Sequence, residues 1–223
     1  MTTPNEDPNQ ARALQGLTHA SSSVRLRAAL AIGTTPDPRF VDRLVERCAV
    51  EEDFFVRDML TWALTRHAPA TTVPKLIEAL RSELAQARSQ ALHTLSKIGD
   101  RRAWPAITLA LLTDADHEVA QSAWRAAVVL VPAGEEPALA RVLATQLGRG
   151  GHATQRSLSQ ALVALGAATW PILPAALADP DPRVRQHAAA TQRLLRDPEA
   201  GFEFAIEQAK RAAALHGAPN PEG

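Results

Sequence analysis

Two tryptophans, Trp62 and Trp124, carry the most informative surface chemistry that residue type and spacing suggest. Each follows a valine-led helix start by a few residues, and polar or charged side chains stand at nearby positions. Exposed aromatic side chains beside arginine are typical of hot spots in binding surfaces. The pattern favours a binding groove over a reaction centre. The candidate groove residues are Asp58, Trp62, His93, Gln121, Trp124 and Arg125.

This assignment depends on helical register. Positions 2, 5, 6 and 9 after each helix start project away from the packing side, and in a curved solenoid that side is concave. The competing interpretation is that both indoles fill gaps between helices, because tryptophan is highly buried on average. A shift of one residue in the assumed register would move an indole from the exposed side to the packing side, so both interpretations stay open.

The residues that usually carry catalysis or bind metals form no recognisable motif. The seven histidines fall at unrelated positions, and no HExxH or CxxC spacing occurs, with His93 beside Asp58 as a minor exception. Cys48 stands where other repeats have leucine, so we expect a buried small hydrophobe and not a nucleophile. The Gly148–Gly151 segment lacks GK[ST] and follows a helix, which indicates an enlarged interhelical loop. We expect no catalytic residue, metal site or cofactor.

Composition narrows the classes of partner. The chain has 223 residues, with 24 Lys+Arg and 24 Asp+Glu, so its formal net charge is zero. A neutral protein has no global field that attracts nucleic acid or acidic membranes. One cysteine cannot form an internal disulfide, the start MTTPNEDPNQ is no signal peptide, and the apolar runs are too short to span a bilayer. We expect a cytoplasmic monomer that does not contact membranes.

An internal repeat positions the candidate residues. Helix-start anchors recur 32, 31, 32 and 34 residues apart, at Asp42, Pro74, Pro105, Pro137 and Pro171. A second helix follows each one, with small or apolar residues at positions 0, 4, 7 and 8. The pattern predicts two-helix units over about 10–37, 38–69, 70–101, 102–133, 134–167 and 168–197. It also predicts a capping helix over 202–215, a domain over 10–216, and disordered tails over 1–9 and 217–223.

The stretches DPDPRVRQHAAATQRLL, residues 179–195, and ARSQALHTLSKIGD, residues 87–100, resemble the HEAT repeat. The likeness is to the short bacterial form of the phycobiliprotein lyase-like HEAT families, and it covers residues 10–197. The resemblance implies an all-α fold: a right-handed α-α superhelix, or armadillo-like solenoid, of about six HEAT-like hairpins. Such arrays serve mostly as binding surfaces, and a fold alone assigns no chemistry.

An arginine recurs at the start of four second helices. In repeats that resemble these, the arginine usually pairs with the Asp of its own or a neighbouring turn, which implies a structural ladder. A basic ladder that tracks phosphates is the alternative. The ladder residues are Arg25, Arg57, Arg88 and Arg185.

The sequence therefore predicts a non-catalytic scaffold that binds a protein or peptide in its concave groove. One alternative is a DNA glycosylase built on HEAT-like helices, or another nucleic-acid-binding protein, although zero net charge disfavours both. A second alternative is a lyase or chaperone for bilin or another small cofactor. No catalytic motif of either family matches this chain.

Overall fold

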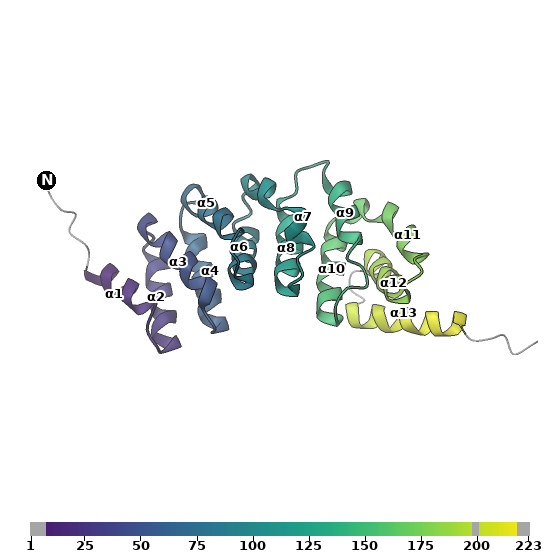
Figure 1. Cartoon of the computed structure of the whole chain (residues 1–223), viewed down its shortest axis with the longest axis horizontal. Helices are drawn as coiled ribbons and strands as arrows, with labels where there is room; N and C mark the ends of the chain where they lie inside the picture. Colours follow the sequence, from purple (N-terminus) through teal and green to yellow (C-terminus); the bar gives the residue numbers. More distant parts are fainter. Residues whose placement is uncertain (1–7, 198–200, 218–223) are drawn as a thin grey trace, which may run out of the picture. The chain divides into compact units, whose positions relative to one another are not determined.

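The chain folds into helices throughout residues 8–197 and 201–217, which are the residues that the computed structural model describes (Figure 1). It divides into two compact units, unit 1 up to Ile107 and unit 2 from Thr108. The boundary falls inside the fourth predicted hairpin. Each unit is therefore described by itself.

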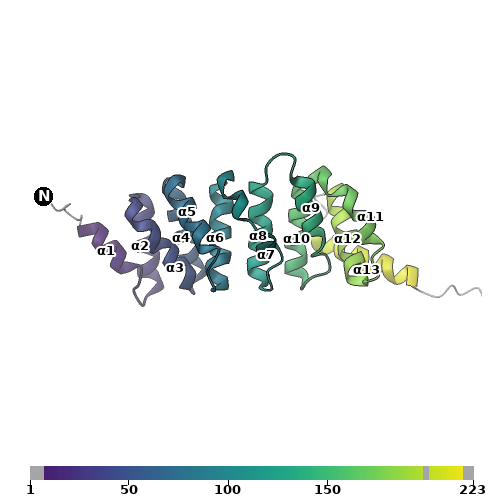
Figure 2. The same ribbon diagram turned by 45° about the horizontal axis from the view of Figure 1, so that its top comes forward.

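Unit 1 holds three helical hairpins in two layers, with the first helices in one layer and the second helices in the other (Figures 1 and 2). Turns of a few residues join the two helices of each hairpin, which brings them together as antiparallel neighbours. The hairpins are α1 (Pro8–Gly16) with α2 (Ser22–Thr34), α3 (Val41–Val50) with α4 (Phe54–Arg66), and α5 (Pro69–Ala79) with α6 (Ala85–Ile98); the 3-10 helices η1 (Pro38–Phe40) and η2 (Arg101–Ala106) precede α3 and follow α6.

Unit 2 repeats the hairpin three times and adds one helix. Its elements are α7 (Leu109–Leu112) with α8 (His117–Leu130), α9 (Glu136–Ala144) with α10 (His152–Ala164), and the 3-10 helices η3 (Gly166–Ala168) and η4 (Trp170–Ile172), followed by α11 (Leu173–Leu177), α12 (Pro182–Arg196) and α13 (Phe202–Gly217).

Helix α13 lies beside α12 in both views of the ribbon (Figures 1 and 2). Its apolar residues cover α12 at the end of unit 2. Phe202, Ile206 and Ala209 pack with Ala190 and Leu194 in one buried cluster. An open array would leave the apolar side of α12 in water, so a terminal helix stabilises it. The predicted capping helix is confirmed.

The packing positions predicted from the repeat are also confirmed. The residue four places after each helix start is buried in all six copies, because positions 0 and 4 share the side that faces the other helices. Five of the six are alanines, which let helix axes approach closely. These residues are Ala28, Leu60, Ala91, Ala123, Ala161 and Ala188.

Some predicted boundaries differ from the structure. Helix α1 begins at Pro8, so residues 8 and 9 of the predicted N-terminal tail are helical, and residues 1–7 lie outside the described range. Helix α13 continues to Gly217, and the rest of the predicted C-terminal tail, 218–223, also lies outside it. Pro74 is inside α5 and does not start it, because that helix already begins at Pro69.

Candidate functional site

The four ladder arginines share one interaction, and it involves the backbone. Each directs its Nη1 at two carbonyl oxygens of the preceding interhelical turn, six and five residues earlier in the chain. In the last copy, Arg185 Nη1 lies 2.7 Å from the oxygens of both Asp179 and Pro180. The same contacts join Arg25 to His19 and Ala20, Arg57 to Glu51 and Glu52, and Arg88 to Ser82 and Glu83.

The predicted partner, a turn aspartate carboxylate, is therefore wrong for Arg57 and Arg185, whose guanidiniums donate to main-chain oxygens. The physical reason is that an interhelical turn leaves carbonyls without helical partners, and these oxygens need donors. The turn aspartates do something else: Asp53, for example, accepts the N–H groups of Phe55 and Val56 and so caps α4.

Arg25 also binds a carboxylate directly. Its Nε and Nη2 each lie 2.7 Å from an oxygen of Glu51, in the turn of the next hairpin. The Glu51 side chain is fully buried, and it also accepts hydrogen bonds from Arg47 Nε and the Asp53 N–H. Burial alone would raise the pKa of this carboxyl, but the hydrogen bonds from Arg25, Asp53 and Arg47 lower it to about 2. A permanently charged network thus joins the first two hairpins.

The fourth hairpin has Ala120 where four other hairpins have arginine, and the Gly148–Gly151 loop supplies the missing group. Arg149 Nη2 donates to the carbonyls of Asp114 and Ala115, which lie six and five residues before Ala120. The arginine therefore comes from the following hairpin and occupies the position of the absent one. The enlarged loop is structural.

A buried histidine holds this loop in place. The Gly148 N–H donates to Nδ1 of His187 at 3.0 Å, and His187 Nε2 lies near the Gln155 carbonyl and the Ser159 hydroxyl. Gly148 has φ = +81°, and an added Cβ would lie 3.0 Å from Val184, so only glycine fits. Burial lowers the pKa of His187 to about 4, so the ring is neutral at pH 7. Ser159 and His187 are fully buried, which keeps substrates from this pair.

We expect Arg149→Ala to lower the free energy of unfolding of unit 2 by about 1–3 kcal/mol, because two turn carbonyls lose their donor. The matched rescue is Arg149→Ala with Ala120→Arg, which returns the arginine to the position that it has in four other hairpins. Urea unfolding followed by circular dichroism measures both. A single variant as stable as the wild type, or a double variant less stable than the single one, would contradict this role for the loop.

The six predicted groove residues divide equally between the units. Asp58, Trp62 and His93 belong to unit 1, and Asp58 and Trp62 are exposed there while His93 is half-buried. In unit 2, Arg125 is exposed and donates to Ser122 Oγ, and half-buried Gln121 lies 3.5 Å from Thr154 Oγ1.

Trp124 does not belong to an exposed surface, and its predicted role as a groove anchor is wrong. Its side chain is 0% exposed, and its Nε1 donates to the Leu112 carbonyl at 2.8 Å. The reason is register. Trp124 stands five residues after its helix start, and this position is buried in the second helix of each of the first four hairpins. These residues are Ala29, Thr61, Leu92 and Trp124.

The sixth position behaves differently, and it defines a surface in unit 1. Leu30 and Trp62 are exposed and His93 is half-buried, and they come from α2, α4 and α6, which pack in that order. Neighbouring helix axes lie about 8–10 Å apart, so three side chains at one register form a row. We call this row, together with Asp58, the second-helix face.

The Trp62 indole is held against α2 by a glycine. A Cβ on Gly33 would lie 2.3 Å from Cζ3 of Trp62 and 2.9 Å from the Ala63 Cα, so no other residue fits there without a shift. The ring is fixed on one side, yet 37% of the residue stays exposed. A rigid and half-exposed indole is suited to binding, because its side chain loses little conformational entropy when a partner binds.

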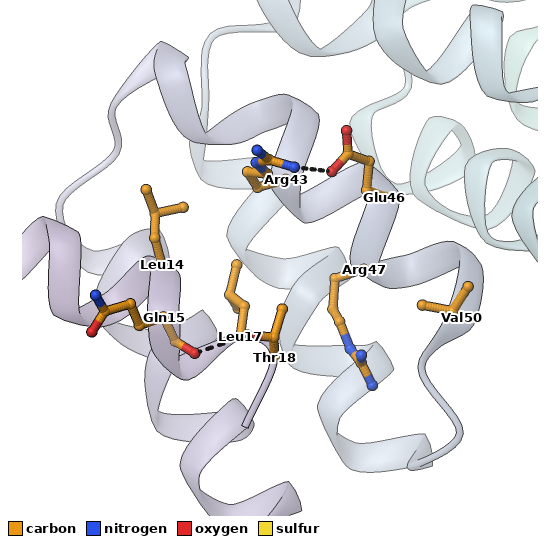
Figure 3. A pocket seen from close by; sticks show the side chains of 8 residues that line it. All are labelled: Leu14, Gln15, Leu17, Thr18, Arg43, Glu46, Arg47 and Val50. Carbon is orange, nitrogen blue, oxygen red and sulfur yellow. Dashed lines mark hydrogen bonds and ion pairs between the residues drawn. The ribbon is translucent and has the colours of Figure 1, made fainter. Parts of the chain in front are cut away.

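A separate pocket of about 550 Å³ lies between α1 and α3 (Figure 3). Leucines and Val50 give it an apolar lining, and two arginines face it. Arg43 already forms an ion pair with Glu46 at 2.8 Å and Arg47 with Glu51, so neither guanidinium offers an uncompensated charge to a ligand. The lining residues are Leu14, Gln15, Leu17, Thr18, Arg43, Glu46, Arg47 and Val50.

The remaining features are the single cysteine, the side chains that could bind a metal ion, and the apolar helices. Cys48 is buried, and desolvation raises the pKa of its thiol to about 12. Within residues 8–197 and 201–217, no cluster of three His, Cys, Asp or Glu side chains could hold a metal ion. In the same residues, no single helix is long and apolar enough to cross a membrane; one pair, His152–Ala164 with Gly166–Leu177, meets that test together but is bent by 109°.

The repeated antiparallel hairpins define the class of the protein as an all-α superhelix. Residues 56–127 match the sequence profile of the family described as HEAT repeats. Residues 56–127 are thus HEAT repeats, as the sequence predicts, and the hairpins on either side share their architecture. The narrower likeness to phycobiliprotein lyase-like families and the right hand of the superhelix stay predictions. A search of curated proteins finds no match.

The solved structure of a karyopherin supports the fold. The karyopherin Kap121p, bound to the extreme C-terminus of the protein phosphatase Cdc14p, matches with a TM-score of 0.61 and 17% identity, over 93% of this chain and 25% of the karyopherin. An engineered protein (TM-score 0.44, 20% identity, 87% of this chain and 100% of that one) and human deoxyhypusine hydroxylase in complex with glycerol (TM-score 0.46, 18%, 92% and 96%) also match. TM-scores below 0.5 support no conclusion.

Proposed function

We propose that this chain is a non-catalytic interaction module, and that it binds a protein or peptide segment on the second-helix face of unit 1. The observation that supports this most is Trp62, whose indole is fixed over Gly33 and still exposed. Tryptophan is enriched among the residues that dominate binding energy. The same kind of use is known for the Kap121p structure, which holds a phosphatase C-terminus.

The mechanism is geometric. Packed helices hold Leu30, Trp62 and His93 at fixed spacing, so a partner meets a surface that is already ordered. An apolar side chain of the partner would lie against Trp62 and Leu30. Asp58, one turn before Trp62 on α4, would accept a hydrogen bond and fix the partner's orientation. The proposed face is confined to unit 1, so Gln121 and Arg125 of unit 2 are not part of it.

The test is affinity purification from the native source with mass spectrometry, using wild type and Trp62→Ala. We expect Trp62→Ala to lose the specific partner, with affinity reduced at least thirtyfold, since hot-spot truncation costs about 2 kcal/mol or more. Trp170→Ala is the matched control, because that indole is 38% exposed but lies in unit 2. Asp58→Arg provides a second variant without a packing change.

The proposal would be contradicted if the wild type and the two folded variants, Trp62→Ala and Asp58→Arg, captured identical partners. The purification also tests the alternatives, because bound nucleic acid or a coloured ligand would be seen directly. The glycosylase alternative needs exposed aromatic side chains that hold a damaged base. Trp124 is buried, so it cannot contact one.

A further inference from the structure

The exposed side of α4 carries three different groups in one line. Asp58, Trp62 and Arg66 are all exposed, and they stand four residues apart. Residues four apart in a helix lie on one side of it, about 6 Å from each other along the axis. The helix therefore presents a carboxylate, an indole and a guanidinium, in that order.

Helix α6, which packs beside α4, continues the basic end of this line. Exposed Lys97 follows half-buried His93 by four residues, just as Arg66 follows Trp62. Among the described residues, neither the Arg66 nor the Lys97 side chain has a hydrogen bond or an ion pair. Two uncompensated cations thus lie one turn beyond the second-helix face, on neighbouring helices.

Cations predominate on the second helices of unit 1. Helices α2, α4 and α6 carry two basic residues each, six in all, and Asp58 is their one carboxylate. Arg66 and Lys97 are two of these six. The other four already donate to Glu51 or to backbone carbonyls, and they are Arg25, Arg27, Arg57 and Arg88.

The charges that surround the last turns of α4 and α6 do not reverse this sign. Arg101 is a further exposed cation there, and the nearby carboxylates are paired. The pairs are Asp37 with Arg39, Asp42 with Lys75, and Asp100 with Arg102.

The remaining charges belong to the turns at the opposite ends of α4 and α6. These turn residues are Glu52, Asp53, Arg81 and Glu83. Because α4 has 13 residues, its two ends are about 20 Å apart. The last turns of α4 and α6 therefore attract negative charge, and the first turns do not oppose it at close range.

We propose, as an extension that rests on the proposed function, that the partner segment is acidic. A large apolar side chain of the segment lies against Trp62 and Leu30, and carboxylates of its Asp or Glu residues lie against Arg66 and Lys97. A donor or cation on the other side of the apolar residue lies against Asp58. Complementary charges of this kind determine which partner binds and in which direction it lies.

The spacing gives the segment a pattern. An extended chain advances about 6.6 Å every two residues, close to the 6 Å that separates Trp62 from Arg66 along α4. Helix axes about 8–10 Å apart place Lys97 about three residues further along such a chain. The pattern is therefore a large apolar residue, one carboxylate two residues away, and another within about five residues.

A nucleic acid matches this surface less well than a peptide does. Its backbone is negative along its whole length, whereas the line on α4 has a carboxylate at one end and cations at the other. The chain also has no net charge that would attract a polyanion. A peptide can match both signs.

Selection of a random 12-residue phage-displayed library on the purified full chain tests the proposal. We expect enriched peptides that carry a net negative charge and a large apolar residue close to Asp or Glu. Synthetic copies should bind Arg66→Glu/Lys97→Glu at least about tenfold more weakly than the wild type, and Arg66→Gln/Lys97→Gln at least about threefold more weakly. Added salt should weaken binding by the wild type, because these charges are exposed to solvent.

The control variant is Arg81→Glu/Arg156→Glu, which makes the same change in net charge at two other exposed arginines. It should bind the peptides as the wild type does. A cation in the last turn also stabilises its helix, so the unfolding temperature of every variant is measured beside its affinity. If the Glu pair fails to fold, the neutral Gln pair decides the result.

Trp62→Ala separates this proposal from the function on which it rests. Peptides that lose affinity for Trp62→Ala but bind both Arg66/Lys97 variants unchanged would overturn the acidic segment and leave the docking face in place. No enrichment, or peptides that bind Trp62→Ala unchanged, would overturn both. Enrichment of basic peptides, or tighter binding of single-stranded DNA than of the acidic peptides, would also overturn the acidic segment.

Discussion

Trp124→Ala is expected to lower the free energy of unfolding by about 3–5 kcal/mol, the usual cost of emptying a large aromatic site in a core. The Trp124 side chain is fully buried, and it carries the hydrogen bond to the Leu112 carbonyl. The substitution therefore leaves a cavity and a buried acceptor without its donor. Urea unfolding followed by circular dichroism measures the loss.

Trp62→Ala is the matched comparison, because the same side chain is removed from a half-exposed position. We expect it to cost less than about 2 kcal/mol, since part of the indole already contacts water. An equal or larger loss for Trp62→Ala than for Trp124→Ala would contradict the assignment of one indole to the core and the other to the surface.

Glu51→Gln is expected to cost about 3–5 kcal/mol, because it leaves the buried Arg25 guanidinium without its carboxylate. The amide keeps the shape of the side chain but removes its charge, and its NH2 group would face arginine donors. Glu52→Gln is the control, since the neighbouring carboxylate is exposed. Equal stability of the two variants would contradict a network that joins the first two hairpins.

The same carboxylate predicts an acid-sensitive unit 1. The folded-state pKa of Glu51, about 2, lies below its ordinary value of 4.5, so its contribution is fully present above pH 4.5 and is lost as the pH falls toward 2. The contribution amounts to about 3 kcal/mol at neutral pH. Acid titration of stability should show this loss in the wild type and not in Glu51→Gln.

The architecture follows from the sequence because it depends on local periodicity. Spacings near 32 residues and alanines such as Ala91 and Ala123 determine which helices form and which sides pack, and both are visible without coordinates. The two tryptophans show where this reasoning stops. Positions 5 and 6 differ by 100° around a helix, and the fifth is buried in the second helices of the first four hairpins. Only the packing of the helices reveals which of the two positions is covered.

Contacts between repeats also explain the other omissions. Arg149 acts on a turn 35 residues earlier, so no motif within one repeat predicts it. The missing arginine at Ala120 was the available signal, together with an enlarged loop that contains an arginine. Arg66 and Lys97 were visible as basic residues near the ends of two predicted helices, but helical period alone does not say whether a charge is paired.

The central claim is that Trp62 contacts the partner, and its fluorescence tests this directly. The recombinant partner, or the segment of it that binds, is titrated into the wild type and into Trp62→Phe while the tryptophan emission and the affinity are recorded. We predict a blue shift on binding that disappears in Trp62→Phe, with weaker binding by that variant. An unchanged shift and unchanged affinity in Trp62→Phe would contradict the account.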